Sequence, residues 1–211
     1  MYKTILLFAL LILGSFSISL PDEKEDKVIK IALDNLSISL AKIPVGQENY
    51  YGFSNREEFK TSSVEKPYRV ITFTNDFYNE DKLIDKNYIL IQNEWRVPVT
   101  VNGENRLLLT VSQQDTTLEV VDLGGAVLAK ELQKKDDNVS SGSRYLLRIY
   151  PLALDFFVKV TPGSSLADAT YIPLTSATIA INSLNEKRIS KLTLPEVLHI
   201  VKQLLKQQSK N

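Results

Sequence analysis

The chain has 211 residues, of which 44% are hydrophobic and 24% charged, so it is long enough and apolar enough to bury a core. Its 25 Lys and Arg residues balance 25 Asp and Glu residues, and this zero net charge argues against a general nucleic-acid-binding protein. Cysteine is absent and histidine occurs once, which excludes disulfide bonds and zinc sites of the usual cysteine–histidine type.

The first 19 residues have the pattern of a secretory signal peptide. Lys3 precedes an apolar run over 5–13, and Ser17 and Ser19 supply the small residues for cleavage before Leu20. The alternative is an uncleaved anchor, but the run is shorter than the roughly 20 residues that span a bilayer. The sequence therefore predicts a secreted or periplasmic bacterial protein that keeps no stable membrane span after cleavage.

Residues 24–43 are predicted to form a helix. Its broad apolar face consists of Val28, Ile29, Ala32, Leu33, Leu36, Leu40 and Ile43. Ile31 and Ile38 form a second, narrow stripe. This stripe indicates either a helix covered on two sides, which we favour, or a strip that binds a partner.

A long polar loop follows the helix, from Pro44 to about Pro67. Loops of this length are uncommon within a domain, so we expect it to be functional, partly helical around 56–60, or mobile. Strands are expected at 68–74 and 88–92, joined by a turn-rich connection over 75–86 and followed by a turn at Asn93–Glu94.

The segment from Trp95 to Val111 predicts a β-hairpin, because apolar residues alternate with polar ones in both arms. Asn102-Gly103 is typical of a two-residue turn. That turn would pair Val99 with Arg106 and put the two apolar faces on opposite sides of the sheet. We therefore expect an odd loop or a bulge that pairs Val99 with Leu107 or with Leu109.

Trp95 shares the parity of Val97 and Val99 and is expected in the core. Pro98 lacks an N–H, so we expect it at a sheet edge or at a non-bonded position.

The remaining elements follow the same kinds of pattern. A third strand is expected at 118–121, a helix at 124–135 with Asp122 as its cap, and strands around 145–149, 156–160 and 171–174. Residues 175–183 are ambiguous between strand and helix. The last helix begins with Thr193, Leu194, Pro195 and Glu196, which form a capping box.

This order of elements predicts an α+β fold. An antiparallel meander over about 68–122 carries N-terminal, middle and C-terminal helices packed on it. Residues 20–211 are expected to form a single domain. The alternative is two subdomains divided at the polar segment near 134–143.

Few residues offer catalytic chemistry. His199 is predicted to point away from the apolar face of its helix, so it is interpreted as a surface residue rather than a base. No metal or cofactor is implied, and Gly124-Gly125 lacks the rest of a phosphate-binding signature. A hydrolase that uses carboxylates alone remains the alternative function. Asp155 is its candidate for a pKa raised by burial, with Glu94 as partner.

Arginine is concentrated in the predicted strands, at Arg69, Arg96, Arg106, Arg144 and Arg148, whereas Lys159 is the one lysine that clearly lies in a strand. The planar guanidinium suits carboxylates and phosphates. Outward arginines also simply cover a sheet and meet water, and this is the interpretation that we favour. Arg96, Arg106, Arg144 and Arg148 are nevertheless the candidate ligand-binding residues. The predicted function is a non-catalytic binding or scaffolding protein for an unknown protein or anionic ligand.

Overall fold

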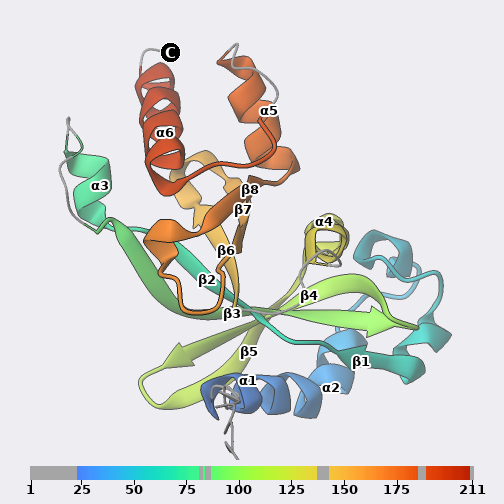
Figure 1. The fold of residues 1–211 in the computed structure, drawn as a ribbon. Coiled ribbons are helices and arrows are strands. Elements are labelled where there is room, and N and C mark those ends of the chain that lie inside the picture. The colour runs from blue at the N-terminus through green and yellow to red at the C-terminus, as the bar shows by residue number, and fades with distance from the viewer. Residues whose placement is uncertain (1–22, 81–82, 84–86, 137–142, 185–188, 210–211) are drawn as a thin grey trace, which may run out of the picture.

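One sheet runs through the molecule in the order β5-β4-β3-β2-β6-β7-β8, with β1 pairing β3 beyond the end of β2 (Figure 1). The computed structural model describes residues 23–80, 83, 87–136, 143–184 and 189–209. The expected signal peptide therefore lies outside the described residues. All the strand pairs are antiparallel except β2–β6, which is parallel. The strands are β1 (Ser62–Val64), β2 (Tyr68–Phe73), β3 (Ile89–Val101), β4 (Glu104–Gln114), β5 (Thr117–Gly124), β6 (Arg144–Ile149), β7 (Leu154–Lys159) and β8 (Thr170–Pro173). The predicted α+β fold is confirmed.

The N-terminal helix is broken in two, α1 (Glu23–Asp34) and α2 (Leu36–Ala41), so the prediction of one helix over 24–43 is wrong in this detail. The break is at Asn35, whose side-chain amide donates a hydrogen bond to the Ile31 carbonyl at 2.9 Å. A side chain that bonds to the backbone in this way competes with the helix. Ile31 packs on the core, whereas Ile38 is 61% exposed, so only half of the second apolar stripe is covered.

The loop over 44–61 contains two 3-10 helices, η1 (Glu48–Tyr51) and η2 (Arg56–Thr61), as the partly helical alternative predicted. Between them Phe53 is 1% exposed and packs on the same core as α1 and α2. The first half of the expected connection at 75–86 is a short helix, α3 (Asn75–Asn79).

Strand β3 is continuous from Ile89 to Val101, so the expected turn at Asn93–Glu94 is wrong. Glu94 instead pairs with Ser112 of β4. The first part of β3 also pairs with β2 and its last part with β1. Glu94 pairs with β4 on one side, and the flanking Ile91 and Trp95 pair with β2 on the other, so this pairing outweighs the turn tendency of two polar residues.

The hairpin β3–β4 has both the two-residue turn and the bulge. Asn102 and Gly103 have φ angles of 52° and 78°, and Val101 pairs with Glu104. A bulge then shifts the register, so Val99 pairs with Leu107 and Val97 with Leu109. The expected bulge is confirmed, and it puts the apolar residues of both arms on one face.

Two other expectations for this hairpin are borne out. Trp95 is 3% exposed and belongs to the core under α1. The Pro98 carbonyl accepts a hydrogen bond from the Glu65 N–H at 2.9 Å, on the side away from β4. The N and C=O of a strand residue point to the same side, so the proline nitrogen also faces away from β4 and no bond of that ladder is lost.

Helix α4 (Ala126–Asp136) begins later than predicted, and Asp122 does not cap it. Asp122 is part of β5, where it pairs with Thr110. Gly124 and Gly125, with φ angles of 156° and 68°, make the sharp connection from β5 into α4. This helix packs on the face of β4 opposite α1, through a core of Tyr68, Leu108, Ala129, Leu132, Leu146, Phe157 and Leu174.

The third core lies at the other end of the sheet, where α3, α5 (Thr175–Ser183) and α6 (Leu194–Gln208) pack on β6, β7 and β8 (Figure 1). The ambiguous segment 175–183 is therefore helical. The capping box of Thr193 and Glu196 is confirmed, with 2.7 Å between the Thr193 nitrogen and Glu196 Oε2. His199 is exposed, as predicted. Within the described ranges, no helix has the length and apolarity that crossing a membrane requires.

Candidate functional site

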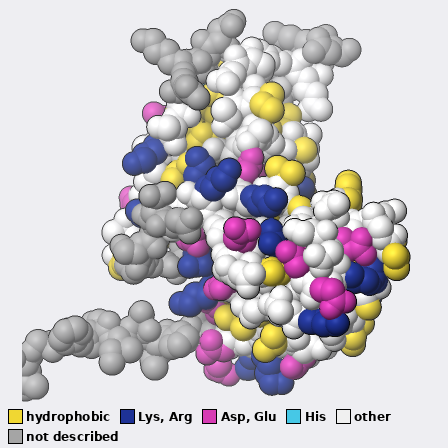
Figure 2. All heavy atoms as spheres, turned by 90° about the vertical axis from the view of Figure 1, so that its right-hand side faces the viewer, with side chains coloured by type: hydrophobic (Ala, Val, Ile, Leu, Met, Phe, Trp, Pro, Cys, Tyr) yellow, Lys and Arg dark blue, Asp and Glu magenta, His cyan; other side chains and the backbone are white. Residues whose placement is uncertain are grey.

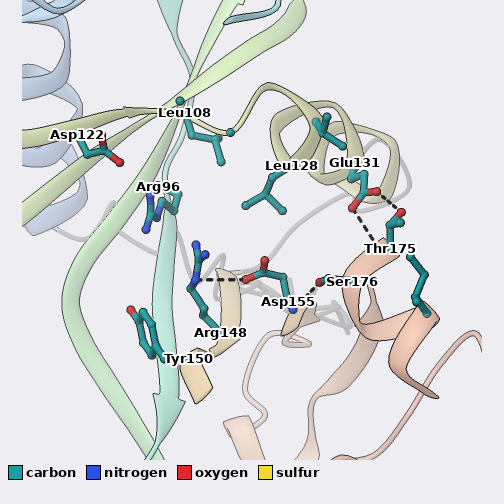
Figure 3. A pocket seen from close by; sticks show the side chains of 14 residues that line it. Arg96, Leu108, Asp122, Leu128, Glu131, Arg148, Tyr150, Asp155, Thr175 and Ser176 are labelled. Atoms are coloured by element: carbon teal, nitrogen blue, oxygen red, sulfur yellow. Dashed lines mark hydrogen bonds and ion pairs between the residues drawn. The ribbon is translucent and has the colours of Figure 1, made fainter. Parts of the chain in front are cut away.

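A cleft of about 720 Å³ lies between α4 and the start of α5 (Figure 3). Its walls come from segments that are far apart in the sequence. The charged residues are Arg96, Asp122, Glu131, Arg148 and Asp155, and the apolar ones include Leu108, Val127, Leu128 and Ile179. This volume is within the range of about 300–1,000 Å³ that small-molecule sites occupy.

Arg96 reaches the cleft from β3, where it points away from the core that holds Trp95 and Val97. Its Nη2 lies 2.9 Å from Glu94 Oε1, and its Nη1 donates a hydrogen bond to the Thr110 hydroxyl. The side chain is only 16% exposed. Arg96 is thus held in place by the neighbouring strand and largely neutralised by Glu94.

Arg148 is the more available cation. It is on β6 directly opposite Asp155 of β7, but its Nε lies 3.9 Å from Asp155 Oδ1, too far for a hydrogen bond. Among the described residues, Asp155 is its only carboxylate partner within 4.0 Å; the guanidinium also lies 5.8 Å from the Tyr150 ring centre. Its terminal nitrogens therefore remain available to an anion.

Asp155 confirms the expectation of a carboxyl with a raised pKa. Burial is the main cause, Glu131 raises the pKa further, and Arg148 and Arg96 oppose both effects. The side chain is 13% exposed and Oδ1 makes no hydrogen bond to the described residues. The Asp155 backbone N–H donates to the Ser176 hydroxyl at 3.0 Å, which fixes β7 against α5.

Glu131 closes one end of the cleft by joining α4 to α5 (Figure 3). Its carboxylate accepts hydrogen bonds from the Thr175 N–H, at 3.2 Å, and from the Thr175 hydroxyl. Glu94, the partner that we expected for Asp155, pairs with Arg96 instead. Nothing in the sequence marked Glu131 as a neighbour of Asp155, because only the packing of α4 beside β7 brings them together.

Asp122 lies on the β5 side of the cleft, beyond Arg96 (Figure 3). It is exposed and makes no ion pair within 4.0 Å with a described residue. The sequence suggested only a capping role for it. Tyr150, in the 3-10 helix η3 (Tyr150–Leu152), was also missed; burial and then Glu94 raise the pKa of its phenol, so it stays a neutral donor.

The four predicted arginines do not meet in one site. Arg96 and Arg148 line the cleft. Arg106 lies outside it, with Glu58 Oε1 at 3.2 Å and Glu104 Oε2 at 3.1 Å. Arg144 lies 2.8 Å from Asp136 Oδ2 and lines a second, smaller cavity of about 220 Å³.

The face of the molecule in Figure 2 has no broad patch of charged side chains of one sign. Figure 2 shows Lys and Arg side chains interspersed with Asp and Glu over the middle of one face, and few charged groups above them. Across the ranges that the structure describes, no group of three or more His, Asp or Glu side chains is arranged to hold a metal ion. No protein-family model, curated protein or solved structure matches the chain.

Proposed function

We propose that this chain is a non-catalytic binding protein that holds a small ligand in the cleft between α4 and α5. The observation that carries the proposal is the state of Arg148. It lines the cleft of about 720 Å³, yet its one carboxylate partner among the described residues is 3.9 Å away. A partly buried guanidinium with unused donors is a recognition group for a carboxylate or another anion.

A ligand screen by thermal unfolding tests the proposal. A compound that binds the folded state stabilises it by RT ln(1 + L/Kd), where L is the free ligand concentration, so the melting temperature rises with the logarithm of that concentration once it exceeds Kd. The Ile179→Trp variant fills the mouth of the cleft and should lose the shift. Ile38→Trp on α2 is the matched control, because the two isoleucines are 66% and 61% exposed. Equal shifts in both variants would place the ligand elsewhere and contradict the proposal.

We also propose that the protein acts outside the cytoplasm. The support is in the sequence: an apolar run followed by small residues at 17 and 19, and a chain without cysteine that must rest on its own core. A binding protein in such a compartment meets small ligands directly, without a transport step.

The alternative function, a carboxylate-dependent hydrolase, has one observation in its favour. Asp155 has a raised pKa and Glu131 contributes to it, so two carboxyl groups interact within one cleft. Glu131, however, is occupied by Thr175 at the start of α5. The test is hydrolysis of a panel of chromogenic glycosides and esters. Turnover by the wild type that is lost in Asp155→Asn would favour the enzyme.

A further inference from the structure

We propose that the ligand of the cleft is a short apolar peptide with free ends, whose carboxylate binds Arg148 and whose amino group binds Asp122. This inference rests on the proposed binding function and names the class of ligand. It starts from two unsatisfied charges of opposite sign that line the same cavity.

The carboxylate position follows from the geometry of Arg148. The Nε is directed at Asp155, while the two terminal nitrogens have no carboxylate partner among the described residues. A planar guanidinium binds a carboxylate through two parallel hydrogen bonds, which a single terminal carboxylate provides. The side chain is 29% exposed, so a ligand reaches it from the cleft.

The amino position follows from Asp122. Its carboxylate lines the cleft and is exposed, and none of the described cations pairs with it. A primary ammonium group would donate hydrogen bonds to it. Both a lysine side chain and a terminal amine carry such an ammonium group. A ligand that also provides a carboxylate for Arg148 must be a zwitterion.

The distance between the two groups indicates the length of the ligand. Asp122 is on β5 and Arg148 on β6, four strand spacings apart in the order β5-β4-β3-β2-β6. Four spacings correspond to about 19 Å between backbones in a flat sheet. Both side chains line the same cavity of about 720 Å³, so their charged ends lie closer together than the two backbones do. A tripeptide or tetrapeptide in extended form spans roughly 10–14 Å at about 3.4 Å per residue, whereas a single amino acid is too short.

The walls between the charges suit apolar side chains. Val127 and Ile179 are 73% and 66% exposed at the mouth, and Leu108 and Leu128 lie between α4 and the sheet. Apolar groups of a ligand would remove this surface from water. A polar sugar would bring no apolar groups to cover this apolar surface.

The charge balance argues against a phosphate or another dianion. The cleft holds two arginines, one of them paired with Glu94, against the carboxyl groups of Asp122, Glu131 and Asp155. A second negative charge on the ligand would face these acids without a free cation. A zwitterion adds no net charge and satisfies Arg148 and Asp122 together.

The experiment is calorimetric titration of the full mature chain with trileucine and two derivatives, one amidated at the carboxyl end and one acetylated at the amino end. We expect trileucine to bind the wild type and each derivative to bind about tenfold or more weakly, because each loses a charged hydrogen-bonded pair. The derivatives need no protein variant, so folding does not affect this comparison.

Protein variants assign each end of the peptide. Arg148→Gln should weaken trileucine about tenfold, yet lose nothing further with the amidated peptide, since the two changes remove one interaction. Asp122→Asn should behave in the same way with the acetylated peptide. Arg106→Gln is the matched control, an arginine outside the cleft, and should bind trileucine like the wild type.

The outcomes separate the two proposals. Absence of trileucine binding, or equal binding of all three peptides, overturns the peptide inference. If a fatty acid or sugar then raises the melting temperature of the wild type but not of Ile179→Trp, the binding cleft stands and only the ligand class is wrong. If no compound of either class gives a different shift of the melting temperature in Ile179→Trp and in Ile38→Trp, both the binding cleft and the peptide ligand are contradicted.

Discussion

Arg148 and Asp155 lie directly opposite each other in the β6–β7 pair, and 3.9 Å separates Nε of the arginine from Oδ1 of the aspartate. Charged hydrogen bonds are usually about 2.7–2.9 Å long, so this is a loose ion pair. It holds the carboxylate and the guanidinium near each other without using the donors of either terminal nitrogen. A ligand therefore approaches Arg148 without first breaking a strong pair.

Asp155→Asn should stabilise the protein at neutral pH. Burial raises the pKa of Asp155 above its ordinary value of 3.8, so the folded state binds a proton more tightly than the unfolded state. Protonation of Asp155 therefore contributes its full stabilisation of the folded state below about pH 3.8. This contribution is lost as the pH rises through the raised pKa of the folded state. Asparagine is neutral throughout and avoids that loss.

Urea denaturation of wild type and Asp155→Asn from pH 3 to 7 measures this difference. The advantage of the variant should grow as the pH rises above about 4 and disappear below it. A variant that is less stable than wild type at pH 7 would show that the pair with Arg148 outweighs the cost of burying the charge.

Trp95→Ala should lower the free energy of unfolding by about 3–5 kcal/mol, because a large side chain that is 3% exposed leaves a cavity. Lys24 and Arg69 also lie over the ring, at 5.0 and 5.4 Å. Chemical denaturation gives the value. Ile38→Ala, at a side chain that is 61% exposed, should change stability by no more than about 0.5 kcal/mol.

Gly52→Ala should be much more destabilising than Gly103→Ala, although both glycines have positive φ, 88° and 78°. A Cβ on Gly103 would meet no atom within 4 Å, so only backbone strain of about 1–2 kcal/mol is expected. A Cβ on Gly52 would clash with the Arg106 carbonyl oxygen. Backbone cannot move aside cheaply, and we expect at least about 3 kcal/mol. Similar denaturation midpoints for the two variants would contradict this.

The mature protein should begin at Leu20 when the full chain is expressed in a secreting bacterial host. The small residues Ser17 and Ser19 fit the positions that signal peptidase requires. N-terminal sequencing of the exported protein checks the cleavage site. Recovery of the chain with Met1 intact would show that the segment is not removed.

The sequence by itself determined the local structure well where side chains repeat with a clear period. The alternation through Trp95, Val97 and Val99 placed the tryptophan in the core and required an odd loop or a bulge in the hairpin, because an unshifted register would expose one apolar face; the structure has the bulge. Thr193 and Glu196 marked the start of α6 through their own side chains. Asp155 could be singled out since apolar residues flank it in a strand.

Only the tertiary structure decided which charged residues meet. A period of two assigns a side chain to one face of a strand, but it does not say which strands are neighbours. Arg96 and Arg148 share a cleft because the parallel pairing of β2 with β6 brings two distant segments into one sheet. Arg106 and Arg144 occupy strand positions of the same kind in the sequence, but they form ion pairs outside the cleft, with Glu58 and Asp136. The cleft itself arises because α4 lies near the start of α5, where Glu131 accepts hydrogen bonds from Thr175, and no local pattern encodes this long-range contact.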